Sequence, residues 1–251
     1  MASPKGCRLK ADVEVAESLL IENPLDNWYL LSRLASGKIS ECDILGGSVR
    51  LLDSENGKHL YAVDSFQSFQ ALYEAVRHRP GPNVSLVTRT DFHRDIIQVD
   101  PTLRANAFNQ LLCATSLPIH PMEGIDFLPI QEAAIPWILE VYQHPELNPG
   151  FIKQRIIESP TCLALKAGTP VGFILSHCDA ELGPVYVAPT ERGTGLATQL
   201  LARVVPEFLK QGIRPGMFVS PSNTRSYGWL KRIGCTQIPH QALWFWREST
   251  S

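Results

Sequence analysis

The sequence predicts an α/β (α+β) protein in two parts, an α/β lobe followed by a domain with a mixed central sheet flanked by helices. Three observations support this. Apolar runs of strand length alternate along the chain with segments whose apolar residues recur at helical spacing. The segment SLPIHPMEG at 116–124 breaks both patterns with two prolines and a glycine. Near 185–211 a short strand, a glycine turn and an apolar-periodic helix follow one another. We therefore expect an N-terminal α/β lobe over 1–120 and a second domain over 121–251.

The second domain has the clearer pattern. The Ala167-Gly168-Thr169-Pro170 segment predicts a β-hairpin between its two flanking apolar runs. The expected elements are strands at 125–128, 161–166, 171–177, 185–187 and 216–220, a pair of strands within 235–247, and helices at 131–143, 150–158 and 194–211. A further helix is expected to begin at the N-cap Asn223 and to stop at Gly234 in a left-handed conformation. In the first lobe we expect helices near 12–22, 65–78 and 102–113 and strands near 43–52, 59–63 and 84–88. The segment DSENG at 53–57 predicts a hairpin turn there.

Composition indicates a soluble globular protein. Of 251 residues, 44% are hydrophobic and 19% charged, and the net charge of −2 gives no general attraction for nucleic acid or for an anionic membrane. No apolar run approaches the ~18 residues that span a bilayer, and the N-terminus has no apolar leader. The six cysteines and seven histidines lack metal-site spacing. We expect an intracellular protein without a metal, in the cytoplasm, with a mitochondrial location left open.

The segment VYVAPTERGTGLA at 185–197 carries the main functional signal. Glycines at 193 and 195 allow a tight turn and let backbone N–H groups approach a ligand. The helix that follows adds unpaired N–H groups and the positive end of its dipole. Such a turn is suited to bind a phosphate or pyrophosphate. The local charge for a polyanion would come from five basic residues, Arg192, Arg203, Arg225, Lys231 and Arg232.

These residues resemble the acyl-CoA loop of the GCN5-related N-acetyltransferase (GNAT) family, and N-T-R-S at 223–226 resembles that family's second motif. The resemblance covers these two motifs, in the family's order. It implies a central sheet with a splayed strand pair that binds acetyl-CoA or another acyl-CoA. The cofactor-binding positions it implies are Val185, Tyr186, Val187, Arg192, Gly193, Thr194, Gly195, Leu196, Ala197, Asn223 and Ser226. The first lobe is then either a degenerate copy of the same fold or an unrelated α/β lobe.

Candidate acid–base groups come from the chemistry of acyl transfer, which needs a base for the amine. The base candidates near the strand are His177, Asp179 and Glu181. Glu181 is preferred because its position resembles that of the catalytic glutamate of the glycine N-acyltransferase-like branch, a likeness weaker than that of the two motifs. Many family members carry a tyrosine as the acid at the position of Leu230, which cannot donate a proton. Tyr227, one turn earlier, is the remaining acid candidate.

These features predict an acyl-CoA-dependent N-acyltransferase that acts by direct attack on a small amine or an amino acid. Two alternatives stay open: a protein lysine or N-terminal acetyltransferase, and a catalytically silent CoA-binding regulatory or scaffold protein. Aromatic residues could line the acceptor pocket, although packing in a core explains the C-terminal ones better. They are Trp137, Tyr142, His144, Phe151, Trp244, Phe245 and Trp246. The sequence makes no prediction of oligomeric state.

Overall fold

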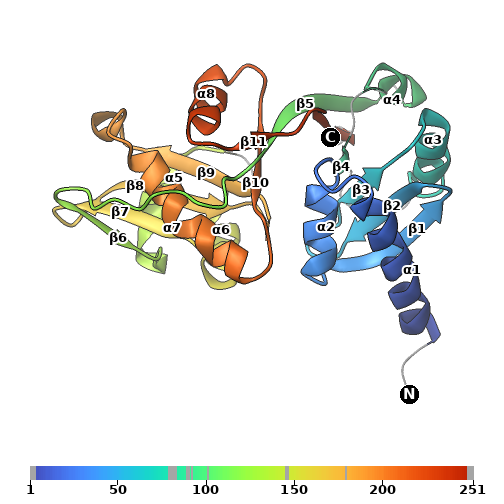
Figure 1. Ribbon diagram of the computed structural model, residues 1–251, viewed down its shortest axis with the longest axis horizontal. Coiled ribbons are helices and arrows are strands. Elements are labelled where there is room, and N and C mark those ends of the chain that lie inside the picture. The colour runs from blue at the N-terminus through green and yellow to red at the C-terminus, as the bar shows by residue number, and fades with distance from the viewer. Residues whose placement is uncertain are drawn as a thin grey trace. The chain divides into compact units, whose positions relative to one another are not determined.

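A computed structural model describes residues 4–247 except 79–83, 89–90, 92, 101, 145–146 and 179. The chain forms two compact units. The first contains Met1–Leu111, Phe218–Tyr227 and Gln237–Ser251, and the second contains Leu112–Met217 and Gly228–Thr236. Each unit combines strands with flanking helices, which confirms the α/β class (Figure 1).

The helices of the described residues are α1 Pro4–Ile21, α2 Trp28–Ala35, α3 Phe66–Glu74, α4 His93–Val99, α5 Ile135–Val141, α6 Pro149–Glu158, α7 Leu196–Lys210 and α8 Thr224–Arg232, with short 3₁₀ turns η1 Glu132–Ala134 and η2 Pro189–Glu191. The strands are β1 Ile39–Leu45, β2 Ser48–Asp53, β3 His59–Ala62, β4 Val84–Val87, β5 Leu103–Leu112, β6 Ile125–Leu128, β7 Cys162–Lys166, β8 Thr169–Ser176, β9 Leu182–Val187, β10 Gly216–Val219, β11 Thr236–Gln237 and β12 Ala242–Arg247.

These strands make two sheets. The larger has the order β1-β2-β3-β4-β12-β5-β10, with β11 paired to β5, and the smaller has the order β6-β7-β8-β9. β3 and β4 run parallel, whereas β4 and β5 each pair antiparallel with β12. The larger sheet is therefore mixed, whereas all strand pairs of the smaller sheet are antiparallel.

The sheet of the first unit buries both faces. On one face Phe245 packs with Tyr61, Phe69 and Tyr73 in a core cluster that α3 and α4 complete. On the other face Trp244 packs edge-on against Tyr29 of α2, at 6.0 Å between ring centroids. Neighbouring residues of β12 thus point to opposite faces, as strand geometry requires.

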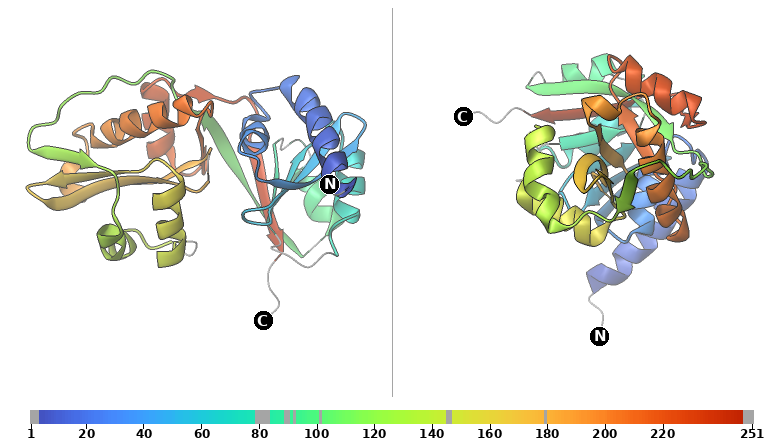
Figure 2. Two further views of the ribbon diagram at one scale, coloured as in Figure 1. Left: turned by 90° about the horizontal axis from the view of Figure 1, so that it is seen from below. Right: turned by 90° about the vertical axis from the view of Figure 1, so that its left-hand side faces the viewer.

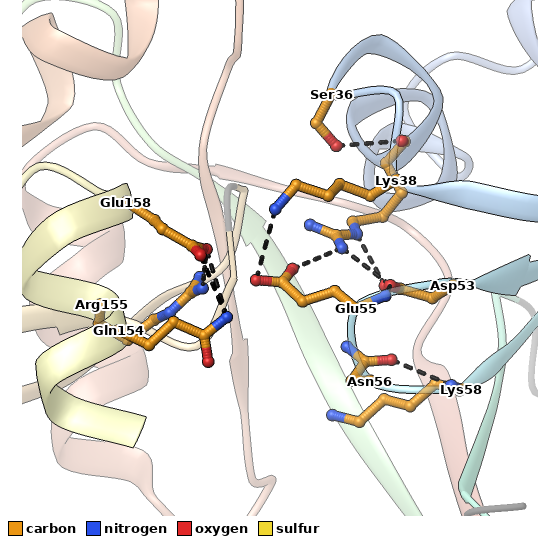
Figure 3. A network of polar contacts seen from close by, with 10 residues as sticks. Ser36, Lys38, Asp53, Glu55, Asn56, Lys58, Gln154, Arg155 and Glu158 are labelled. Carbon is orange, nitrogen blue, oxygen red and sulfur yellow. Dashed lines mark hydrogen bonds and ion pairs between the residues drawn. The ribbon is translucent and has the colours of Figure 1, made fainter. Parts of the chain in front are cut away.

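A buried ion cluster fixes the hairpin turn of this unit. Arg33 is fully buried, and its guanidinium donates to Asp53 at 2.8 Å and to Glu55 at 2.7 Å. Figure 3 shows both carboxylates together with Lys38, whose Nζ lies 3.7 Å from Glu55. The N–H of Gly57 donates to the carbonyl of Asp53, and Gly57 has φ +68°. A buried guanidinium needs charged and hydrogen-bonded partners to be tolerated. The turn that DSENG predicts is confirmed, and its carboxylates have this additional role.

The sheet of the second unit lies between two layers of helix. Figure 2 shows α7 on one face and α5 with α6 on the other. Phe173 and Leu175 of β8 pack with Ile138 and Ile152 in the core on the α5–α6 side. On the α7 side, a Cβ on Gly172 would lie 3.3 Å from the side chains of Leu196 and Leu200. The missing side chain at Gly172 therefore allows α7 to lie close to the sheet.

Two predicted elements of the first unit are wrong. The strand expected at 43–52 is a hairpin, β1–β2, which turns at Gly46 with φ +61°. The helix expected near 102–113 is strand β5, which is paired with β12. Pairing with β12, which lies some 140 positions later in the chain, overrides the helix-forming composition of β5. The Asp100 carboxylate also accepts from the N–H of Thr102, which forms a turn rather than a helix cap.

The division of the chain differs from the single boundary near 120 that the sequence predicts. The break after Leu111 is close to the predicted limit between 1–120 and 121–251, but two C-terminal segments return to the first unit. The reason is strand pairing, because β12 lies between β4 and β5 in the larger sheet. A partner so distant in sequence leaves no local signal that could predict it.

Candidate functional site

The glycine turn has the backbone geometry of an anion site. Gly193 and Gly195 have φ +84° and +90°, and Gly195 is the N-cap of α7. A Cβ at either position would meet no atom within 4 Å, so the left-handed backbone rather than space accounts for the glycines. Residues 192–195 are exposed, and the first turn of α7 has no acidic side chain. The N–H groups at the start of α7 are thus available to an anion.

Side chains around η2 hold this turn in shape. Glu191 is buried and accepts from Lys166 at 2.9 Å. The hydroxyl of Thr194 donates to the carbonyl of Glu191 at 2.7 Å. Arg192 Nε donates to the carbonyl of Val187 at 3.2 Å, and its side chain is exposed beside the turn. No sequence pattern indicates that Glu191 is buried, because a glutamate in a polar turn is ordinarily exposed.

Arg203 does not supply charge to the turn. Its guanidinium lies 3.6 Å from the ring centre of Phe127 and donates to the side chain and the carbonyl of Gln199. Gln199 in turn donates to the carbonyl of Pro118. Burial lowers the pKa of Arg203. Its role is structural, because it packs the segment after β5 against α7.

Strand β9 presents one unpaired edge next to the turn. The other edge pairs with β8, with Tyr186 opposite Phe173. The N–H of Ala188 donates to the carbonyl of Val171, so alternation turns the N–H groups of Val185 and Val187 away from β8. The Tyr186 side chain stacks on Phe173, with 5.8 Å between the ring centroids. Val185 and Val187 therefore offer backbone donors, and Tyr186 holds the strand.

β9 and β10 are neighbours at one point. Glu181 forms an isolated parallel bridge with Gly216, whose N–H donates to the carbonyl of Ala180 at 2.9 Å. Beyond this bridge the strands belong to different sheets, β9 at the edge of one and β10 at the edge of the other. The splayed strand pair that the resemblance implies stays a prediction beyond this bridge.

Glu181 and His177 lie on the connection between β8 and β9. The N–H of His177 donates to the carbonyl of Glu181 at 2.8 Å, and both side chains are half-buried. A Cβ on Gly183, which has φ +146°, would lie 3.3 Å from the His177 imidazole. The ring therefore sits against the first residues of β9 because glycine leaves room there. Asp179, the third base candidate, lies outside the described residues.

The second motif begins helix α8. Asn223 Oδ1 accepts from the N–H of Ser226 at 3.1 Å, which is the N-cap the sequence predicts. Tyr227 donates its hydroxyl proton to Gln237 Oε1 at 2.5 Å. Asn223, Ser226 and Tyr227 group with the first unit, whereas the glycine turn belongs to the second. Their shared role with the turn stays a prediction.

The end of α8 is tied to α7 within the second unit. Trp229 Nε1 donates to Thr198 Oγ1 at 3.0 Å. Leu230 is 1% exposed and packs in the interior, so the position where the family often has tyrosine is here part of the core. Gly234 ends the segment with φ +86°, as predicted for a left-handed stop.

An open cavity of about 470 Å³ lies beside α5, lined by Leu139, Tyr142, Gln143, His144 and Leu147. Tyr142 stacks with His144, and burial raises the pKa of the Tyr142 hydroxyl. Two of the aromatic residues expected at an acceptor pocket thus line this cavity. Trp244 and Phe245 do not, because they pack inside the first unit, as the core interpretation requires.

Within the described residues, no group of three His, Cys, Asp or Glu side chains could hold a metal ion. Across the same residues, no helix has the length and apolarity to cross a bilayer.

Comparison with known proteins finds similar folds, some of them in proteins named as acetyltransferases. Residues 165–245 match the FR47-like protein family. A Drosophila protein superposes with a TM-score of 0.75 at 13% identity over 96% of this chain and 97% of its own. A GCN5-related N-acetyltransferase-like protein from Streptococcus suis gives 0.57 at 14% identity over 95% and 100%. A GCN5-related N-acetyltransferase from Kribbella flavida gives 0.53 at 13% over 87% and 95%. A search of curated proteins found no match.

Proposed function

We propose that this chain, which has the fold of the GCN5-related N-acetyltransferases, transfers an acyl group from an acyl-CoA to the amine of a small molecule or an amino acid. The observation that carries the proposal is the glycine turn, with Gly193 and Gly195 in left-handed conformation at the start of α7. It directly follows a strand with a free edge. This combination offers donors for a pyrophosphate and for a pantetheine arm side by side.

In this proposal the backbone N–H groups of the glycine turn and of β9, together with the Arg192 side chain, bind the acyl-CoA. The N–H groups from Gly193 to Ala197 and the exposed Arg192 would hold the pyrophosphate. The N–H groups of Val185 and Val187 would bind the pantetheine and polarise the carbonyl that is attacked. Acyl-CoA itself supplies the activated thioester. These donors are fixed by the strand and the turn, so they need little rearrangement on binding.

Glu181 is the base we assign. It lies at the bridge where β9 and β10 part, and its main chain is held by Gly216 and His177. A half-buried carboxylate there can accept the ammonium proton directly or through a water, which frees the lone pair of the amine. His177 is the second candidate, because its ring lies against Gly183 on the same connection.

One observation favours a second candidate function, a silent acyl-CoA-binding protein. Leu230 is buried and has no ionisable group, and the Tyr227 hydroxyl already donates a hydrogen bond to Gln237. A thiol with a pKa of about 8.5 leaves without much help from an acid, so the lack of an acid at Leu230 is compatible with turnover. Binding and turnover must therefore be measured separately.

The first test is thermal unfolding with CoA, acetyl-CoA and octanoyl-CoA, with ATP as a control that lacks the pantetheine arm. Ligand at ~100 times its Kd stabilises the fold by about 2.7 kcal/mol, which raises Tm by roughly 5–10 °C for a chain of this size. We expect this rise with the CoA compounds and not with ATP. An unchanged Tm with all four would contradict the proposal.

Turnover is then tested by mass spectrometry of acylated products. We expect acylation of small amines or amino acids. Acylation of lysine peptides alone would replace the proposed acceptor class by protein. Binding without any product would support the silent CoA-binding protein.

A further inference from the structure

Two cysteines far apart in the sequence meet in the second unit. Cys113 follows β5 and Cys235 precedes β11, and each thiol shifts the pKa of the other. Both are buried, at 1% and 5% exposed. The proposed acyl transfer uses neither of them. The pair was missed in the sequence because 121 residues separate its members.

The two cysteines lie opposite each other, one residue beyond the paired strands β5 and β11. β11 pairs with β5, and the N–H of Ile238 donates to the carbonyl of Gln110 at 2.9 Å. Gly234 lies next to Ala114, with 3.8 Å between an added Cβ and the Ala114 Cβ. The two segments therefore run in opposite directions, and their register places Cys113 opposite Cys235.

Cys113 and Cys235 face each other as a non-hydrogen-bonded antiparallel pair, in which the two residues exchange no backbone hydrogen bonds. The N–H of Cys113 donates to the carbonyl of Pro215 at 2.9 Å, on the side away from β11. Such pairs have Cα atoms ~4.5 Å apart, their side chains being closer than in hydrogen-bonded pairs. That distance is within the range that a disulfide bridges without backbone movement.

The surroundings differ for the two sulfurs. The Cys113 thiol and a backbone N–H of Ala114 donate to Cys235 Sγ, and with the nearby Arg214 they lower the pKa of Cys235 despite its burial. The hydrogen bond to Cys235 and burial raise the pKa of Cys113. Cys235 is thus the more readily ionised sulfur and the better attacking group at neutral pH.

We propose that Cys113 and Cys235 form a thiol–disulfide site that reacts with low-molecular-weight disulfides such as oxidised glutathione. The Cys235 thiolate attacks one sulfur of the small disulfide and releases one glutathione thiolate, which takes up a proton. Cys113 then loses its proton, and its thiolate attacks Cys235 Sγ to displace the second glutathione as a thiol. The two protein thiols are oxidised and one small disulfide is reduced to two thiols.

The bridge would act on segments next to the proposed acyl-CoA site. Cys113 holds Pro215, and the following Gly216 is the bridge partner of Glu181. The N–H of Cys235 donates to the carbonyl of Leu230 and closes the end of α8. Oxidation would therefore fix the ends of β10 and α8 together.

The test is peptide mapping of the full-length protein after incubation with oxidised glutathione. We expect the peptides of Cys113 and Cys235 to be joined by a disulfide, and two of the six thiols to be lost. A bridge that closes so long a loop should raise Tm by roughly 10–20 °C, reversibly with a reducing agent. This readout does not depend on acyl transfer.

The variants Cys113→Ala and Cys235→Ala should lose the stabilisation, whereas Cys162→Ala, a buried cysteine of β7, should keep it. Wild-type protein that retains all six thiols, joins other cysteines or stops at a glutathione adduct would overturn the proposal. The wild-type map decides this even where a variant fails to fold.

Discussion

At the scale of single residues, position on the backbone distinguishes the candidates that residue type alone leaves equal. His177 and Glu181 both have ionisable side chains, and both lie near β9. The Glu181 main chain is fixed on two sides, by His177 and by the bridge to Gly216. Glu191, by contrast, is held by Lys166 at 2.9 Å, so its carboxylate has a structural role. A catalytic base must be placed reproducibly, which favours the residue at the bridge.

Glu181→Gln is expected to lower kcat by ~100-fold, because a positioned base contributes that much or more, while the Kd for acetyl-CoA stays the same. Steady-state kinetics and titration calorimetry measure the two quantities. Glu123→Gln, at an exposed glutamate of the same unit, is the matched control and should leave both unchanged. If His177→Gln shows the loss and Glu181→Gln does not, the base is His177.

At the scale of elements, the strand–turn–helix unit of β9, η2 and α7 concentrates the proposed binding groups. Leu196, buried at the first position of α7, packs against Gly172 of β8 and anchors the helix start to the sheet. The turn itself stays exposed. An apolar anchor directly after flexible glycines orients the helix N-terminus without covering its N–H groups.

Gly195→Ala is expected to weaken acetyl-CoA binding at least 10-fold and to lower stability by about 1 kcal/mol, since an L-residue at φ +90° is strained. Gly168→Ala is the matched control. Gly168 also has a positive φ, +77°, with no atom within 4 Å of an added Cβ, but it lies in the β7–β8 turn. It should show the same loss in urea unfolding with unchanged binding. Equal binding by both variants would contradict the pyrophosphate assignment.

At the scale of the whole molecule, the chain order and the order in space differ. The chain leaves the first unit after Leu111 and returns to it twice before its end. β12 supplies Leu243 and Phe245 to the core of the first unit, both at most 1% exposed. The N-terminal segment therefore lacks a central strand of its own sheet until the last residues are present.

Deletion of residues 241–251 is expected to abolish cooperative unfolding of the first unit. The loss of two large buried side chains removes roughly 3–6 kcal/mol of burial, besides the strand pairing on both edges of β12. That approaches the whole stability of a typical domain. Urea unfolding followed by circular dichroism measures this. Deletion of 248–251 alone removes none of the contacts described here and serves as control; similar curves for both deletions would contradict the expectation.

The sequence by itself determined the elements whose signals are local. The glycine turn, the N-cap Asn223, the hairpin turn at 53–57 and the apolar stripe of α7 all depend on residues within a few positions of one another. The GNAT resemblance rested on the same local signals, and the fold is similar to that of solved GCN5-related N-acetyltransferases. Its narrower likeness to the glycine N-acyltransferase-like branch stays a prediction.

Only the tertiary structure decided the features that depend on distant partners. β5 is a strand because β12 pairs with it, Arg203 is structural because Phe127 and Gln199 hold it, and Cys113 meets Cys235 through the pairing of β5 with β11. Turn and helix signals are encoded in φ preferences and hydrogen bonds between near neighbours. Strand pairing and burial are encoded in contacts that a linear reading does not contain, because loop closure can join almost any two segments at little extra entropy.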